Sequence, residues 1–440
     1  MGGKRRASST IPHHKPMTVF AAASLGIGSM VGAGIFALMG EAGAIAGSAV
    51  YLSFILGGIV ALLSGYSLAR LGVRYPAAGG IVEYLVQSYG VGLFSGAMAV
   101  MLYIAALVAL ALVAKTFGSY AVTFFTLGES SHLWVNGFAN SIIIVFVLIN
   151  LEGAGSVARW EKPIVAFKVL ILIGFAVTGL IFSRPELLSP SLYPESKMVL
   201  YSLAITFFAF EGFRVITNAA EDMPDPARTL PRAIFLSIIL VMLLYIAVAL
   251  AVFGNLDVEQ VIKAKDFALA QAAYPVFGTA GFTIVAIAAL ISTASSINAN
   301  LYAVTNVTYQ MAKDGELPSE FGEPIGHSRE GLLISGGLII LMTDFFPLSE
   351  IAAVGSIAIL IVHLIVHLGH FRVRRETGAI RSYPAVGGTG CTVGDWICRR
   401  LFDKNLTEHY LVCTGRIALC LCHRISAPSV YGKACSDTDT

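Results

Sequence analysis

Two apolar stretches of the sequence contain the residues best suited to bind a small charged molecule. The first, GIGSMVGAGIF at residues 26–36, carries glycines two or four residues apart, although glycine is a poor residue for a helix interior. The second, FFAFEGFR at residues 207–214, places Glu211, Gly212 and Arg214 among phenylalanines. If both helices unwind there, bare N–H groups suit a carboxylate and bare C=O groups suit an ammonium group. The pattern therefore predicts a site for a zwitterion.

The composition predicts that the elements holding these stretches cross a membrane. Of 440 residues, 56% are hydrophobic and 13% are charged, and the mean hydropathy is +0.77, whereas soluble domains have about 25% charged residues. The net charge of +2 is too small to suggest a nucleic-acid partner. No catalytic triad, phosphate loop or pair of catalytic acids stands out, so we do not expect an enzyme.

Ten apolar runs predict an all-α polytopic membrane protein of about ten helices. They lie near residues 17–39, 48–73, 93–114, 140–150, 163–182, 199–219, 233–253, 278–304, 331–346 and 351–370. The two interrupted stretches fall in the first and sixth runs, which are matching positions if residues 17–183 and 198–371 form two five-helix repeats. An odd number of helices inverts the second repeat. Interrupted helices at matching positions indicate a transporter's central binding site.

Basic residues predict the orientation. They are concentrated in the connections on the side of the N-terminus, so we expect residues 1–16 to form a cytoplasmic tail. The ten-helix core is expected at residues 17–375, in the cytoplasmic membrane.

Lys168 is a charged residue inside the fifth run. A lysine within a membrane helix costs from about 2.5 kcal/mol upward at the bilayer centre and normally marks a function. The alternative is a lysine whose side chain extends along its own helix to the lipid headgroups.

Glu211 and Arg214 are three residues apart in the sixth run and can pair, which lowers the cost of both charges. Three interpretations of Glu211 stay open. It can select a cationic substrate, take part in proton coupling, or merely brace the interruption through the ion pair.

Four motifs in order resemble the amino acid–polyamine–organocation superfamily, which has the inverted-repeat fold of the bacterial leucine transporter. They are GIGSMVGAGIF, YPAAGGIVEYL, FFAFEGF followed by AEDMPDPARTLPRAI, and YQMAKDGELP. The resemblance covers residues 17–375. It implies secondary transport of amino acids by alternating access, with the first and sixth helices discontinuous.

The resemblance also implies residue roles. Backbone amides of the first helix would bind the substrate carboxylate, and carbonyls of both helices would bind its amino group, at Met30, Gly32, Ala33, Gly34, Phe208, Ala209 and Glu211. In proton-coupled members a lysine like Lys168 replaces a sodium ion beside hydroxyls, here Ser292, Thr293, Ser295 and Ser296. The aromatic cluster favours an occluding gate over an open pore, with Phe207, Phe210 and Arg214 as gating residues.

Three histidines share a helix face in the tenth run. His363, His367 and His370 have a spacing that can bind a metal, but no carboxylate or cysteine comes from that segment. We therefore expect histidines at a membrane interface, and no metal or other cofactor.

The C-terminal segment, residues 376–440, is polar and contains all six cysteines. It lacks the further apolar helices usual in the superfamily, which favours a frameshift beyond about residue 380 over a genuine metal-binding tail.

The sequence as a whole predicts a proton-coupled amino-acid symporter in a lipid bilayer. An exchanger with the same fold is one alternative, and a sensor that binds an amino acid without moving it is another. The carried amino acid and the oligomeric state do not follow from the sequence.

Overall fold

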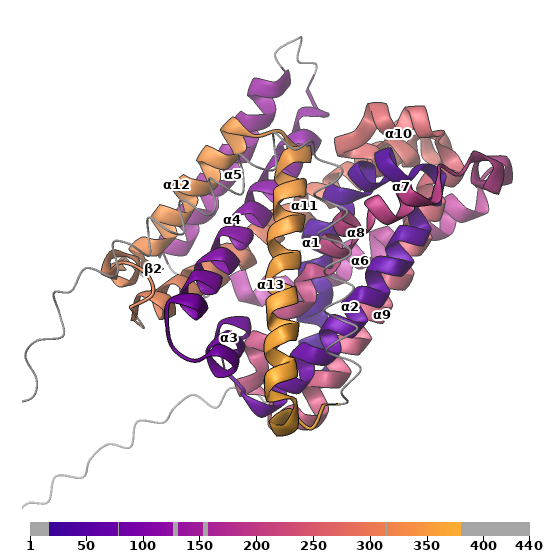
Figure 1. The fold of residues 1–440 in the computed structure, drawn as a ribbon. Helices are drawn as coiled ribbons and strands as arrows, with labels where there is room; N and C mark the ends of the chain where they lie inside the picture. Colours follow the sequence, from indigo (N-terminus) through magenta and orange to yellow (C-terminus); the bar gives the residue numbers. More distant parts are fainter. Residues whose placement is uncertain are drawn as a thin grey trace, which may run out of the picture.

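Apolar sequence on all sides of the long helices produces a bundle in which they pack side by side, as Figure 1 shows for this computed structural model. The structure describes residues 17–379 except 78, 126–130, 153–156, 314 and 327, and the side chains at 33, 131 and 157–162 are not described. The predicted tail at 1–16 and the cysteine-containing segment from residue 380 onward lie outside the described residues.

Nine helices in the described part of the chain are long. They are α1 (Val19–Ala46), α2 (Val50–Arg74), α4 (Leu93–Val122), α5 (Ser131–Glu152), α6 (Val157–Ile181), α9 (Pro226–Asn255), α11 (Ala268–Lys313), α12 (Glu330–Phe345) and α13 (Leu348–Thr377). The short helices are α3 (Ile81–Tyr89), α7 (Ser196–Tyr201), α8 (Leu203–Phe210) and α10 (Val258–Ala264). Turns of 3₁₀ helix are η1 (Gly47–Ala49), η3 (Pro185–Leu188), η4 (Pro190–Leu192), η5 (Glu211–Asp222), η6 (Lys265–Phe267) and η7 (Ser319–Gly322). Two antiparallel strands of two residues each, β1 (Pro324–Ile325) and β2 (Ser328–Arg329), precede α12.

The predicted polytopic membrane class is confirmed. Eight helical stretches of the described chain are long and apolar enough to cross a membrane, and Val19–Gly32 is a shorter apolar one. Each of the ten predicted runs overlaps a helix. With 16 residues, α12 is about 24 Å long, which is less than the roughly 30 Å hydrocarbon core.

Helices of the first half pack against helices of the second half. α2 lies against α9, α4 against α11, and α5 against α12, while α1 lies against α8 and η5. α6 instead lies against α9 and α11, and the two predicted repeats stay a prediction.

The bundle has two distinct ends, which we name the α3 face and the α10 face. In Figure 1, α3 lies at one end and α10 and α7 lie at the other. At the α3 face, the start of α1 meets the end of η5 through the Met17 amide, which donates to the Asp222 carbonyl at 3.3 Å. The ends of α2 and α13 also meet there, because Tyr75 donates to Glu376 at 2.7 Å.

The prediction of a broken first helix is wrong for this structure, because α1 is one helix from Val19 to Ala46. Its glycines serve close packing instead. A Cβ atom at Gly34 would lie 2.4 Å from the Ala209 carbonyl oxygen, and one at Gly32 would lie 2.6 Å from the Ser296 Cβ atom. Neighbouring helices therefore approach the α1 backbone more closely than any side chain would allow.

The predicted interruption of the sixth helix is confirmed. The α-helix α8 ends at Phe210 and the chain continues as the 3₁₀ helix η5. Twelve residues are unusual for a 3₁₀ helix, whose hydrogen bonds are poorer than those of an α-helix and which often marks a hinge. At this junction a Cβ atom on Gly212 would lie 2.4 Å from the Met30 amide nitrogen, so η5 rests directly on α1.

A buried lysine joins α4 to the end of α12. The Lys115 ammonium group donates to the carbonyl oxygens of Thr343 and Phe346 at the end of α12, both at 2.6 Å. We expect Lys115→Met to lower the free energy of unfolding by about 2 kcal/mol, because it removes two charge-assisted hydrogen bonds inside the bundle. Denaturation in detergent measures this loss.

Lys263→Met is the matched control, because Lys263 pairs with Glu259 on the exposed surface of α10. It should leave stability nearly unchanged. Equal effects of the two substitutions would contradict a specific role of Lys115 at the end of α12.

Candidate functional site

The middle of α1 is bonded by side chains from three other helices. Lys168 on α6 donates to the Gly28 carbonyl oxygen at 2.5 Å. Tyr245 on α9 donates to the Met30 carbonyl at 2.7 Å. Ser292 on α11 donates to the Val31 carbonyl at 3.2 Å. We name these three carbonyls the α1 carbonyls and the three side chains the α1 donors.

Lys168 does not extend to the lipid headgroups. Its side chain is 1% exposed, and its bond to Gly28 directs it towards α1 rather than along α6. The headgroup alternative is therefore wrong for this structure.

The predicted hydroxyl cluster on α11 is only partly gathered at α1. Ser292 bonds Val31, and Ser296 packs against Gly32. Thr293 instead donates to the Ala289 carbonyl of its own helix at 2.7 Å, and Ser295 is half-buried.

Tyr245 joins the two helices expected to bind substrate. Besides bonding Met30, its hydroxyl lies 3.3 Å from the Ala209 carbonyl oxygen of α8. Its ring packs against Phe54 and Phe210, with centroids 5.5 and 5.2 Å away. Tyr245 was not predicted as a site residue, although the apolar run of α9 at residues 233–253 contains only two hydroxyl side chains, Ser237 and Tyr245.

A buried charged cluster lies where α8 becomes η5. The predicted ion pair is confirmed, since Arg214 Nε lies 2.5 Å from Glu211 Oε1. The other carboxylate oxygen, Oε2, lies 2.9 Å from His363 Nε2 on α13. His363 Nδ1 in turn lies 2.6 Å from the Ser64 hydroxyl on α2. Glu211 therefore has two partners, and a cationic substrate would have to displace one of them.

The three histidines of α13 are buried inside the bundle. His363, His367 and His370 are 0%, 1% and 0% exposed, so the helix face they share points into the bundle. Within the described residues, no group of three or more histidine, cysteine or acidic side chains could hold a metal ion.

A small cavity of about 40 Å³ adjoins the crossing of α1 and η5. Its lining includes Ser29, Phe208, Glu211, Arg214 and Asn300. Because one water molecule occupies about 30 Å³, this cavity is too small for an amino acid in the present conformation.

The predicted gating aromatics lie in different places. Phe208 lines the small cavity. Phe207 instead packs edge-on against His363, with ring centroids 5.4 Å apart, and Phe210 packs against Tyr245. Arg214 lines the cavity as well as pairing with Glu211.

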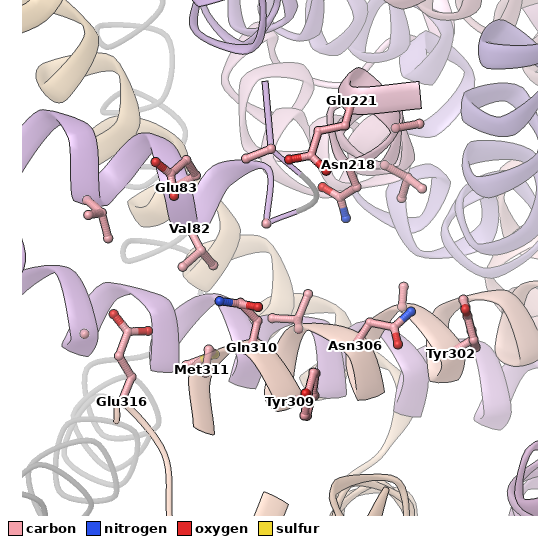
Figure 2. Close-up of a pocket in the computed structure, with 18 of the residues that line it drawn as sticks. Val82, Glu83, Asn218, Glu221, Tyr302, Asn306, Tyr309, Gln310, Met311 and Glu316 are labelled. Atoms are coloured by element: carbon pink, nitrogen blue, oxygen red, sulfur yellow. The ribbon is translucent and has the colours of Figure 1, made fainter. Parts of the chain in front are cut away.

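A large vestibule of about 1320 Å³ lies at the α3 face. Figure 2 shows Val82 and Glu83 of α3 and Asn218 and Glu221 of η5 opposite the side chains of α11. Four carboxylates line it, and none of the described lysine, arginine or histidine side chains does: Glu83, Glu221, Asp222 and Glu316. Val215 lines both the vestibule and the small cavity, so the two spaces lie on either side of this one residue.

The α10 face is covered by η6. The Lys265 carbonyl sits where a Cβ atom on Gly40 would be, and the Lys265 side chain pairs with Glu41 at 3.1 Å. Next to it, Ser119 on α4 donates to Asp266 at 3.1 Å. The bundle is thus hollow at the α3 face, whereas η6 packs directly onto α1 and α4 at the α10 face.

Comparison with known proteins agrees with this architecture. The family model described as amino acid permease matches residues 17–393. The inner membrane transport protein YbaT of Escherichia coli K12 is 38% identical over 375 residues, which are 85% of this chain and 87% of that protein. An uncharacterized protein of Methanocaldococcus jannaschii is 37% identical over 369 residues, 83% of this chain and 84% of that protein. The methylthioribose transporter of Bacillus subtilis 168 is 28% identical over 322 residues, 70% of this chain and 69% of that protein.

The family model covers most of the chain, and similarity to the first two relatives extends over more than four fifths of each protein. Together with the bundle of apolar helices, these matches assign this multi-pass membrane protein to the amino acid permease family.

Proposed function

We propose that this chain is a secondary active transporter that carries an amino acid across the cytoplasmic membrane together with a proton. The family assignment and the relatives named as transport proteins support a transporter. The observation that carries the finer proposal is the set of side-chain bonds to the α1 carbonyls.

These bonds prepare α1 to unwind at its glycines. In an α-helix the carbonyl of residue i accepts from the amide of residue i+4, so the α1 carbonyls are the helical partners of the amides of Gly32, Gly34 and Ile35. A carbonyl that loses its helical partner inside a bilayer must find another within the protein. The α1 donors already supply one to each carbonyl, which lowers the cost of releasing the amides to a substrate carboxylate.

The carbonyl side of the proposed site comes from α1 and α8. The carbonyls of Met30 and Ala209 meet at the Tyr245 hydroxyl, next to the Phe208 ring and Glu211 at the small cavity. A substrate ammonium group bound there would donate to these carbonyls beside the Tyr245 hydroxyl, because a carbonyl oxygen can accept two hydrogen bonds, and Phe208 would cover the substrate.

Substrate passage requires the small cavity to enlarge. The vestibule already has room for an amino acid, and Val215 borders both the vestibule and the cavity, so in this conformation a substrate can approach from the α3 face as far as that residue. In an alternating-access cycle, the next step separates η5 from α1. In the state that is open at the α10 face, η6 no longer lies against Gly40.

Proton coupling is assigned to Lys168. Charged donors form stronger hydrogen bonds than neutral ones, so protonation of Lys168 strengthens its hold on the Gly28 carbonyl and favours release of the Gly32 amide. Proton binding and substrate binding then support each other through the same turn of α1.

We assign the α3 face to the cytoplasm. Helix ends at this face carry Arg70, Arg74, Arg228, Arg232, Arg372 and Arg374, whereas the α10 face carries Arg184, Lys197, Lys263 and Lys265. Short cytoplasmic connections are enriched in basic residues, and this difference supports a cytoplasmic N-terminus.

Transport by the reconstituted protein tests the proposed function. We expect proteoliposomes to accumulate a labelled amino acid from a panel of twenty when a pH gradient is imposed, and to lose accumulation when the gradient is collapsed. Exchange that needs internal amino acid but no gradient would identify an exchanger. Binding without movement of any label would identify a sensor.

Tyr245→Phe tests the preparation of α1. It removes the hydroxyl bonded to Met30 while keeping the ring between Phe54 and Phe210, so we expect transport to fall by roughly tenfold, the effect of about 1.4 kcal/mol. Tyr51→Phe is the control, because Tyr51 bonds Tyr193 away from the site, at 3.0 Å. Equal activity of Tyr245→Phe and the wild type would contradict a role of this hydroxyl.

Lys168→Ala tests the coupling residue. We expect it to lose uptake driven by the pH gradient and substrate-driven proton entry, because no titratable donor remains on Gly28. Lys197→Ala, at an exposed lysine paired with Glu195, is the control. Undiminished proton entry in Lys168→Ala would remove Lys168 from the mechanism.

A further inference from the structure

A line of buried titratable groups runs along α13 from the small cavity towards the α3 face. At its inner end, Glu211 lines the cavity and contacts His363. His367 and His370 follow on the same face of α13, and all three histidines are buried. Such groups are expensive inside a bilayer and normally have a function.

At the inner end of this line, His363 can take up a proton and keep both of its hydrogen-bond partners. With Arg214 charged, Glu211 ionised and His363 neutral, the cluster has no net charge, since Arg214 balances Glu211. His363 has partners on both ring nitrogens, Glu211 and the Ser64 hydroxyl. Because a hydroxyl can donate or accept, Ser64 satisfies Nδ1 whether or not that nitrogen carries a proton.

The middle of the line is not satisfied by protein groups. Neither ring nitrogen of His367 has a hydrogen-bond partner among the described residues. Nδ1 of His370 has none there either. A buried polar group without a partner costs about 1–3 kcal/mol and calls for an explanation such as bound water or a functional role. The ring centroids of His363 and His367 are 6.2 Å apart, a separation that a ring rotation or one bridging water can connect.

The outer end reaches the α3 face. His370 Nε2 lies 3.0 Å from the Thr377 hydroxyl in the last turn of α13. Arg70 of α2 donates to the Gly378 carbonyl just beyond it. The line therefore extends from the candidate substrate site to the end of the bundle where the vestibule lies.

Few other charged groups face this line. The titratable side chains that interact electrostatically with His367 are those of His363 and His370. The one that interacts electrostatically with His370 is Arg70. From α3, the Tyr89 hydroxyl donates to the Ile365 carbonyl at 2.7 Å. α8 has no titratable side chain, and those of α4 that have described contacts face other helices: Tyr103 and Lys115 face α12, and Tyr120 faces α1.

We propose that Glu211 and His363 together form a proton-binding site at the substrate cavity, and that His367 and His370 conduct the proton between this pair and the α3 face. This inference rests on the proposed function, and it adds a proton site on α13 to Lys168 on α6. The proton arriving from the α3 face passes between the histidine rings and binds the His363 imidazole. No covalent bond other than N–H or O–H forms or breaks.

Occupancy of this site changes what a substrate meets. A protonated His363 draws Glu211 more strongly, because the contact between them becomes an ion pair. Arg214, which also lines the cavity, then shares its counter-ion with a second cation. A substrate carboxylate at the released α1 amides compensates for this extra positive charge, so proton and substrate favour each other.

His363→Gln is the decisive variant, because a glutamine amide can donate to Glu211 and accept from Ser64 but does not titrate. In proteoliposomes containing a pH-sensitive dye, we expect it to lose substrate-driven proton entry and gradient-driven uptake while keeping counterflow of labelled amino acid. His132→Gln, at the exposed start of α5, should keep all three activities. Proton entry and gradient-driven uptake at the wild-type level in His363→Gln would overturn the proposal.

Cutting the line without touching the pair gives a second test. His367→Leu leaves Glu211, His363 and Ser64 in place, so we expect slower substrate-driven proton entry with counterflow unchanged. If His363→Gln does not fold, as judged by its thermal midpoint in detergent, an unchanged rate of proton entry in His367→Leu overturns the proposal.

A spectroscopic measurement separates this proposal from the proposed function. Infrared difference spectra of the detergent-solubilised wild type should show a histidine protonation band coupled to a carboxylate change between acidic and neutral pH, and His363→Gln should lack both. If no amino acid moves, the proposed function fails, yet these bands still report the proton site. Identical spectra of the wild type and His363→Gln would disprove that site.

Discussion

The absence of water inside a bilayer is the constraint on which this structure depends. Every polar group in the hydrocarbon region must find its partner within the protein. The α1 carbonyls have donors from α6, α9 and α11, and the junction of α8 and η5 lies against the α1 backbone at Gly212. The polar groups needed for a binding site are thus held by neighbouring helices even while the site is closed.

The same constraint governs the charged side chains. Lys115 and Lys168 donate to backbone carbonyls, and Arg214 pairs with Glu211, so each cation within the apolar region has an oxygen partner. Removing one member of such a pair costs more than the net value of the pair, because the other charge is left buried. His367 is one of several buried side chains with polar atoms that have no partner among the described residues, and its place between His363 and His370 on α13 marks it for a role in proton movement.

Several features followed from local sequence. Hydropathy located the membrane-spanning runs, because each run only had to be long and apolar. The spacing of Glu211 and Arg214 predicted their ion pair, since residues three apart are neighbours on any helix. A lysine at position 168 inside an apolar run marked a buried group. Four short motifs indicated the family, and the family model matches residues 17–393.

The sequence by itself therefore determined the membrane class, the family and the position of the sixth-helix interruption. Only the tertiary structure decided that α1 is intact here, because a glycine permits both unwinding and close packing, and the distance to Ala209 selects between them. It also decided the partners of Tyr245 and His363, which include residues more than a hundred positions away in the chain. Hydropathy and spacing describe one helix at a time, whereas these contacts depend on which helices meet and at what depth.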